Sequence, residues 1–156
     1  MNLDAARLWS TTTLAIWPED FFVIDFAANL YTEIAAYAPS IAKPFVAIVF
    51  EPDQVSLTVS RSEWERSPLL GRERDAGCPF GVVTLKQDVG LDVFGFLAPP
   101  IQRLADAQIP IIPHGSYLKE HWVFLRRDFD RAIDILRTYI DEQTALLRQH
   151  STPAAP

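Results

Sequence analysis

Residues 80–138 read FGVVTLKQDVGLDVFGFLAPPIQRLADAQIPIIPHGSYLKEHWVFLRRDFDRAIDILRT, and this segment carries the strongest structural signal in the chain. A β-branched run comes first, followed by a segment of helical composition, two short apolar runs and a strongly amphipathic segment. This order predicts strand, helix, strand, strand and helix, an arrangement that usually places helices on one face of a small sheet. The expected elements are Gly81–Gln87, Gly95–Ala107, Ile109–Ile112, Trp122–Leu125 and Asp128–Ile140.

The residues before this segment follow a similar order of elements. A strand is expected at Thr11–Trp17, and a helix at Asp25–Ala38 begins with a capping aspartate. Phe45–Phe50 is a continuous apolar run, typical of a strand covered on both faces, and a proline-containing turn connects it to the alternating strand Val55–Val59. The first half therefore reads β-α-β-β and the second β-α-β-β-α, which predicts an internal repeat.

The connection between the two halves sets the predicted domain boundaries. Arg61–Pro79 is charged and contains prolines and glycines, so we expect a solvated loop, with Trp64 anchoring a short turn of helix. Pro99 and Pro100 disfavour helix before them, which predicts an irregular turn up to Ala98 and a regular helix after it. The chain is thus expected to contain a first module at 8–66, a connector at 67–79, a second module at 80–147 and a disordered tail at 148–156.

The composition limits the partners and the compartment. The chain has 156 residues, of which 49% are hydrophobic and 22% charged, and this is a globular composition. The net charge of −6 argues against nucleic acid and against an anionic membrane surface as partners. Cys78 is the single cysteine, which favours a reducing, cytoplasmic location. No apolar stretch approaches the ~20 residues that span a bilayer, and no secretory signal is recognised.

Several motifs match a known family. Phe50–Val59, FEPDQVSLTV, resembles the TPDELSIV hairpin of tandem ACT-domain proteins, the small bacterial ACT proteins related to the CASTOR arginine-sensor family. Leu91–Asp92 and Gly95–Ile109 resemble their LDF…GVLA…LAEAGI segment, and Val123–Ala132 is similar to their ILV(K/R)…DLERA ending. The resemblance covers about residues 11–140.

This resemblance implies an α+β protein with two ferredoxin-like ACT modules of βαββ type packed side by side. It also implies regulation by a small ligand, often an amino acid, bound at an ACT–ACT interface. The ligand-binding regions that it implies are Asp88–Phe94 and Ile111–Ser116. We therefore expect a non-catalytic regulatory protein that binds an amino-acid-like metabolite, acts on a partner protein and forms homo-oligomers by pairing exposed sheet edges.

The residues of the second module indicate how such a ligand is held. Backbone N–H groups near Gly90 can bind a carboxylate, because glycine permits close approach, and Asp88 or Glu120 can bind an amino group. The expected ligand-binding residues are Asp88, Val89, Gly90, Ile112, His114 and Glu120.

Two other functions fit the same sequence. A small cofactor-independent isomerase or cyclase would use His114, Glu120 and His121 as general acid and base in an interface pocket. A plain assembly module would pair sheet edges without any ligand. Neither a cofactor nor a metal is expected, because the chain lacks a phosphate-binding glycine motif and a clustered set of metal ligands.

Overall fold

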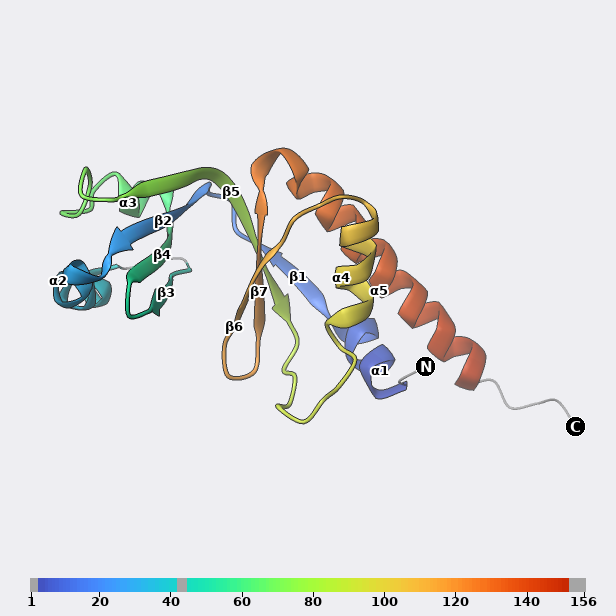
Figure 1. Cartoon of the computed structure of the whole chain (residues 1–156). Helices are drawn as coiled ribbons and strands as arrows, with labels where there is room; N and C mark the ends of the chain where they lie inside the picture. The colour runs from blue at the N-terminus through green and yellow to red at the C-terminus, as the bar shows by residue number, and fades with distance from the viewer. Residues whose placement is uncertain (1–2, 42–44, 152–156) are drawn as a thin grey trace, which may run out of the picture. The chain divides into compact units, whose positions relative to one another are not determined.

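The computed structural model describes residues 3–41 and 45–151, which form two compact units. The terminal unit comprises Met1–Ile16 and Val83–Pro156, and the inserted unit comprises Trp17–Val82 (Figure 1). Both units combine helices with a sheet, so the expected α+β class is confirmed. None of the helices in the described ranges has the length and apolar composition needed to cross a membrane.

The inserted unit is a ferredoxin-like βαββαβ module. Its strands lie in the order β3-β4-β2-β5, and the three pairings between neighbours are all antiparallel. The short 3-10 helices η1 and η2 flank α2. The elements are β2 (Phe21–Ala27), η1 (Ala28–Leu30), α2 (Tyr31–Tyr37), η2 (Ala38–Ser40), β3 (Ala47–Phe50), β4 (Gln54–Ser60), α3 (Arg61–Trp64) and the first part of β5 (Asp75–Lys86).

The core of the inserted unit forms between its sheet and its helices. The expected alternation in β4 places Val55 and Leu57 in this core, both with 0% exposure. Phe26 of β2 packs edge-on against Trp64, with ring centroids 5.9 Å apart. Trp64 therefore anchors the short helix α3, as the sequence predicts.

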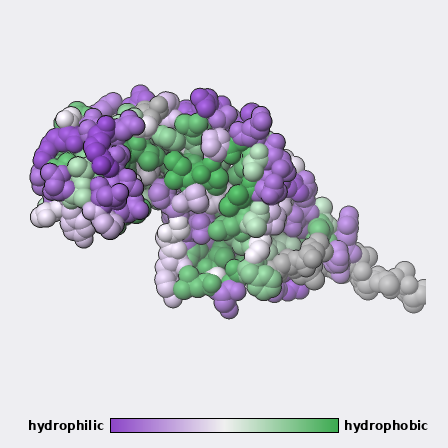
Figure 2. All heavy atoms as spheres, viewed as in Figure 1, coloured by the Kyte–Doolittle hydropathy of each residue, from purple (hydrophilic) through white to green (hydrophobic). Residues whose placement is uncertain are grey.

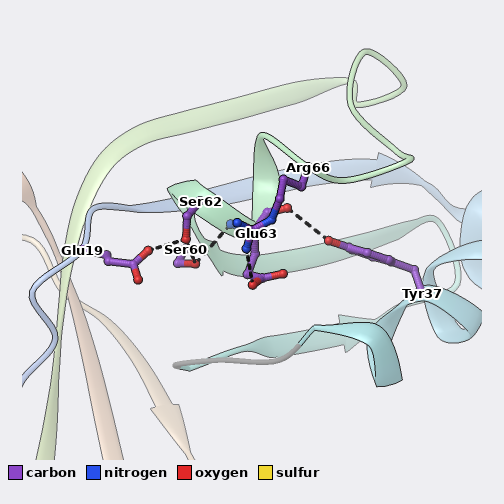
Figure 3. Close-up of polar contacts among 6 residues, drawn as sticks. All are labelled: Glu19, Tyr37, Ser60, Ser62, Glu63 and Arg66. Carbon is purple, nitrogen blue, oxygen red and sulfur yellow. Dashed lines mark hydrogen bonds and ion pairs between the residues drawn. The ribbon is translucent and has the colours of Figure 1, made fainter.

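Polar contacts hold the ends of α3 (Figure 3). The Ser60 hydroxyl caps the helix by accepting a hydrogen bond from the Glu63 N–H at 3.4 Å. The Ser62 hydroxyl donates to Glu19 at 2.6 Å, and the Tyr37 hydroxyl donates to the Glu63 carbonyl at 3.2 Å. These bonds join the loop before β2, the helix α2 and the start of α3 within one module.

The terminal unit has the same strand arrangement with a different chain order. Its strands lie in the order β1-β5-β7-β6. In a ferredoxin-like module the outer strand next to the first strand is the last in the sequence, whereas here this position is occupied by the N-terminal strand β1. The α1 helix packs against α5, so the first and the last helix of the chain lie side by side (Figure 1). The elements are α1 (Leu3–Thr11), β1 (Thr13–Ile16), the end of β5, α4 (Ala98–Asp106), β6 (Ile112–Gly115), β7 (Glu120–Leu125), η3 (Arg126–Asp128) and α5 (Phe129–Ser151).

A cluster of large side chains fills the terminal unit between its sheet and its helices. Trp9 of α1 is fully buried and stacks on Phe96, with ring centroids 4.6 Å apart. Trp122 and Phe124 of β7 and Leu136 of α5 belong to the same cluster. The amphipathic stripe predicted for the last helix is therefore a core face.

The domain boundaries differ from those expected from the sequence. The expected modules were 8–66 and 80–147 with a connector at 67–79, whereas β1 pairs with the end of β5 in the terminal unit. In addition, β5 begins at Asp75, inside the expected connector. The physical reason is that β1 pairs with a strand far along the sequence, and local patterns do not encode such a pairing.

Three local expectations in the first half were wrong. Asp25 is no N-cap, because it lies within β2, and the helix α2 begins only at Tyr31. Residues 3–11 form a helix that was not predicted. The strand β3 is not covered on both faces, because it lies at the edge of the sheet and Val49 and Phe50 are exposed.

The second half agrees better with expectation. The helix α4 follows Leu97 and has its two prolines in the first turn, where proline is tolerated. The final helix extends beyond the expected range to Ser151, so it includes the start of the expected tail at 148–156. Residues 152–156 lie outside the described residues.

Candidate functional site

A cavity of about 280 Å³ lies in the terminal unit, between the loop that follows β5 and the β6–β7 hairpin. The cavity is near the lower end of the range for small-molecule sites, so it suits a small metabolite. Its lining residues are Val89, Gly90, Leu91, Val93, Gly95, Phe96, Leu97, Ser116, Tyr117, Leu118 and Glu120.

Hydrogen bonds fix the two walls of this cavity against each other. The Val89 N–H donates to the Leu118 carbonyl at 2.9 Å, and the Lys119 ammonium pairs with Asp88 at 2.6 Å. Within the hairpin, the Ser116 N–H donates to the Lys119 carbonyl at 2.8 Å. These bonds connect the loop directly to the hairpin.

The rim of the cavity is apolar and strongly exposed. The lining residues Leu91 and Tyr117 are 77% and 76% exposed, and Phe94, in the same loop as Leu91 but outside the lining, is 77% exposed. Figure 2 shows hydrophobic surface in the lower middle of the view, at the end of the terminal unit where this loop lies. Exposed large apolar side chains that cluster in this way often mark an interaction site.

Gly90 is the lining residue next to which several backbone N–H groups are unpaired among the described residues. In the described part of the chain, the N–H groups of Gly90, Leu91 and Asp92 have no hydrogen-bond partner. A Cβ added at Gly90 would meet a carboxylate oxygen of Asp92 at 2.9 Å, so a larger residue requires a shift there. These backbone N–H groups are available donors for a ligand anion.

Glu120 supplies the carboxylate of the cavity. It is partly buried at the start of β7, and burial raises the pKa of its carboxyl group, while the nearby indole of Trp122 opposes that rise. The Trp122 ring is fully buried, and its Nε1 has no hydrogen-bond partner of ordinary geometry among the described residues. An unpaired buried donor costs free energy, so the Trp122 indole N–H favours a nearby acceptor such as the ionised Glu120 carboxylate.

The two histidines of the hairpin lie elsewhere. His114 and His121 face each other across β6 and β7, and the His121 Nδ1 lies 2.9 Å from the Thr84 hydroxyl. Successive strand residues point to opposite faces, so His121 is directed away from Glu120. Burial lowers the pKa of both imidazoles. The set of His114, Glu120 and His121 expected for an enzyme therefore does not converge on one cavity.

The remaining expected ligand-binding residues divide into two groups. Val89, Gly90 and Glu120 line the cavity. Asp88 is engaged with Lys119 beside it, and Ile112 and His114 lie on β6 without lining it. The apolar wall consists of Val93, Phe96, Leu97 and Leu118. Val93 lies within the expected region Asp88–Phe94, and the sequence missed the other three. The signal for this wall was present in the apolar residues around Gly95, a position with a φ of +77° that favours glycine.

Other hollows of the terminal unit are larger but more open to solvent. One of about 500 Å³ lies between α4 and α5, lined by residues that include Arg103 and Asp134. Another of about 430 Å³ lies beside α4 and is lined mainly by apolar residues. Neither brings unpaired backbone donors and a buried carboxylate together. Within residues 3–41 and 45–151, no group of three or more His, Cys, Asp or Glu side chains is placed to hold a metal ion.

The fold is shared with solved structures of low sequence identity. A Vibrio cholerae protein of unknown function, described as a possible transport protein, has a TM-score of 0.65 at 16% identity, over 86% of this chain and 94% of its own. The Agrobacterium tumefaciens protein Atu0741 has a TM-score of 0.64 at 19% identity, over 83% of this chain and 89% of its own. The regulatory subunit of aspartate kinase from Thermus flavus has a TM-score of 0.58 at 14% identity, over 82% of this chain and 97% of its own. No family model and no curated protein matches the chain.

These comparisons establish an ACT-like fold. The expected ferredoxin-like modules are confirmed, because regulatory parts of aspartate kinases share the arrangement over most of this chain. At identities of this size the likeness concerns the fold alone. The relation to the CASTOR family, and the ligand, stay predictions.

Proposed function

We propose that this chain is a non-catalytic regulatory protein that binds a small amino-acid-like metabolite in the cavity between the loop after β5 and the β6–β7 hairpin. The observation that carries the proposal is the meeting of Gly90 and Glu120 in one preformed cavity. The two residues come from separate elements and offer complementary chemistry. Backbone donors suit a carboxylate, and a side-chain carboxylate suits an ammonium group.

The bound ligand then spans the cavity. Its carboxylate accepts hydrogen bonds from the N–H groups near Gly90, and its ammonium group contacts Glu120. Asp88, the other expected partner of the ammonium group, is a weaker candidate because Lys119 already pairs with it. The apolar wall of the cavity packs against the remainder of the ligand.

The regulatory part of the proposal draws on the fold. Regulatory subunits and domains of aspartate kinases share the fold of this chain. Membership of the small ACT proteins related to the CASTOR family is supported by the sequence motifs, and a cytoplasmic location is supported by the single cysteine. In this role the ligand changes the affinity of the chain for a partner protein, through a difference in binding between two states.

Homo-oligomers are part of the same proposal. The strand β3 lies at the sheet edge of the inserted unit, and Val46, Val49 and Phe50 expose apolar surface there. The Tyr31 ring lies 4.1 Å from that of Phe50, which extends this surface to α2. A twofold axis lets two copies of one edge pair with each other. Light scattering at tens of micromolar protein should give the molar mass of a dimer or a larger oligomer. Val49→Lys should lower this molar mass toward that of the monomer.

Thermal shift with the twenty amino acids and common derivatives tests the ligand site directly. A ligand at about 100-fold over its dissociation constant should stabilise the protein by about 2.7 kcal/mol. Gly90→Val should abolish that stabilisation, because the new side chain displaces the exposed Asp92 side chain and covers the approach to the backbone donors. Ala145→Val, at an exposed position of α5, serves as the control and should respond like the unmodified protein.

Two outcomes contradict the proposal in different ways. If no compound shifts the unfolding midpoint, the amino-acid-binding function loses its support, and the plain assembly module gains. If a compound stabilises Gly90→Val and the unmodified protein equally, the ligand is real but binds elsewhere.

A further inference from the structure

The charged side chain that lines the cavity is negative, and none of the described side chains that line it is positively charged. Glu120 is the only carboxylate among the lining residues, and none of them is a lysine, arginine or histidine. Tyr117 is the other ionisable lining residue, and it lies on the exposed rim. A ligand with one carboxylate finds the backbone donors near Gly90. A second carboxylate on the ligand would have no positively charged partner in the lining and would be repelled by Glu120.

The walls of the cavity are apolar where the ligand side chain would lie. Val89, Val93 and Leu97 are half-buried, and Phe96 is 2% exposed with its ring against Trp9. These residues offer no donor or acceptor from their side chains. A charged ligand side chain placed there would lose its hydration without a partner, which is unfavourable.

Trp122 is the neighbour of Glu120 on the same face of β7, because the two residues are two positions apart in one strand. Its Nε1 is buried without a partner of ordinary geometry among the described residues, and it lies close enough to Glu120 to favour the ionised carboxylate. An ammonium group on the cavity side would hold Glu120 ionised, and the indole N–H could then complete its hydrogen bond from the other side.

From these observations we propose that the cavity selects amino acids with a neutral, apolar side chain, with Glu120 as the residue that recognises the ammonium group and Trp122 as the residue that positions Glu120. This inference rests on the proposed ligand-binding function and adds the class of ligand. Acidic amino acids are excluded by Glu120 and by the lack of a cation in the lining. Basic ones are disfavoured by the apolar wall.

A matched ligand series tests the class of ligand without any variant. Leucine, asparagine and aspartate have side chains of similar size and branching, which end in methyl groups, an amide and a carboxylate. Isothermal titration calorimetry should give the tightest binding for leucine and the weakest for aspartate, separated by about tenfold or more. The leucine analogue 4-methylpentanoate, which lacks the amino group, should lose affinity by about tenfold or more, because it cannot contact Glu120.

The role of Glu120 is tested by Glu120→Gln against Asp88→Asn. The first should weaken leucine binding and remove most of the difference between leucine and 4-methylpentanoate. The second weakens the ion pair with Lys119 that connects the cavity walls, so it should change the affinity for both compounds by a similar factor and keep the difference between them. Folding of each variant is checked by circular dichroism. If Asp88→Asn removes that difference and Glu120→Gln does not, Asp88 is the partner of the ammonium group and the assignment is overturned.

The pH dependence of leucine binding separates recognition from a structural effect. Affinity should fall on acidification as Glu120 becomes protonated, and Glu120→Gln should flatten that part of the profile. The loop and the hairpin that form the cavity also carry Asp88, Asp92 and Lys119, and all three are present in both proteins. Trp122→Phe removes the indole N–H, so it should move the midpoint of the profile to higher pH. An unmoved midpoint would overturn the positioning role of Trp122.

The ligand series also distinguishes this inference from the proposed function. If aspartate binds as tightly as leucine and Gly90→Val abolishes both, the cavity binds amino acids but the class of ligand is wrong. If none of the compounds binds, both fail together with the cavity itself.

Discussion

The indole N–H of Trp9 donates a hydrogen bond of 2.7 Å to the backbone carbonyl of Phe96, across 87 residues of sequence. Trp9 belongs to α1, and Phe96 lines the candidate ligand cavity. The two rings also stack with an interplanar angle of 16°. The N-terminal helix therefore fixes the loop that forms one wall of the cavity.

Trp9→Phe keeps an aromatic ring at this position but removes the donor. The Phe96 carbonyl then loses its buried partner, and we expect the free energy of unfolding to fall by about 1–3 kcal/mol. The response to ligand should fall as well, because the wall of the cavity is less fixed. Trp64→Phe in the inserted unit removes a similar buried area and is the control. Trp64→Phe should lower the free energy of unfolding without changing the ligand affinity of the folded protein. An equal loss of affinity in both variants would argue against a local role for Trp9.

Leu136→Ala tests the core face of α5. Leu136 is 0% exposed within the core of the terminal unit, so its truncation should lower the free energy of unfolding by about 2–5 kcal/mol in denaturant titrations. Arg137→Ala is the control at the next position, where the side chain is exposed and its ion pair with Asp134 is solvated. It should change stability by less than about 0.5 kcal/mol. Similar values for the two variants would mean that the stripe is not the core face.

The histidines of the β6–β7 hairpin should make stability depend on pH. Burial lowers the pKa of His114, and it lowers the pKa of His121 with further help from the cations His114, Lys119 and Lys86. Because the unfolded chain takes up these protons at higher pH than the folded one, stability should be complete above the ordinary histidine value of about 6.5 and fall as pH drops below it. Chemical denaturation at a series of pH values between about 5 and 8 measures this slope.

The matching variants isolate the histidine contribution to that slope. Replacement of both His114 and His121 by glutamine should flatten it, whereas Ala145→Gln, at an exposed position of α5, should leave it unchanged. Glu120 contributes with the opposite sign, because its raised carboxyl pKa makes the folded state lose stability as pH rises through the carboxyl range. A slope that survives the double replacement would have to come from other groups.

The sequence predicted most of the second half because its signals are local. Gly90 follows the end of a strand, and Glu120 begins a strand after a tight hairpin, so both were recognisable from neighbouring residues. Their meeting in one cavity follows from the strand-helix-strand-strand order of the module. The histidines were grouped with Glu120 only because they are close in sequence, and strand alternation separates them.

The first half was harder because its apolar spacing is ambiguous. Phe26, Leu30 and Ile34 follow one another at helical spacing, but Phe26 lies in β2, Leu30 in η1 and Ile34 in α2. All three are buried in one core, so the spacing reflects a shared interior rather than one helix. The role of Trp9 could not be predicted either, because its partner Phe96 is distant in sequence. Long-range pairings of this kind leave no periodic trace.

The end of α4 offers a change that should increase stability. Gln108 has a φ of 58°, in the left-handed region that side chains with a Cβ adopt at a cost. It follows the last turn of the helix, where the Gln108 N–H donates to the Ala105 carbonyl and the Ile109 N–H donates to the Leu104 carbonyl, both at 2.9 Å. Glycine is the residue that this type of helix end favours, since it has no Cβ.

Gln108→Gly should therefore raise the free energy of unfolding by about 0.5–1 kcal/mol, even though glycine makes the unfolded chain more flexible. The matched control is Gln102→Gly, in the middle of the same helix, where the same change should lower stability by about 1 kcal/mol. Denaturant titrations of the two variants should thus give shifts of opposite sign. A loss of stability in both would mean that position 108 does not hold the left-handed conformation in solution.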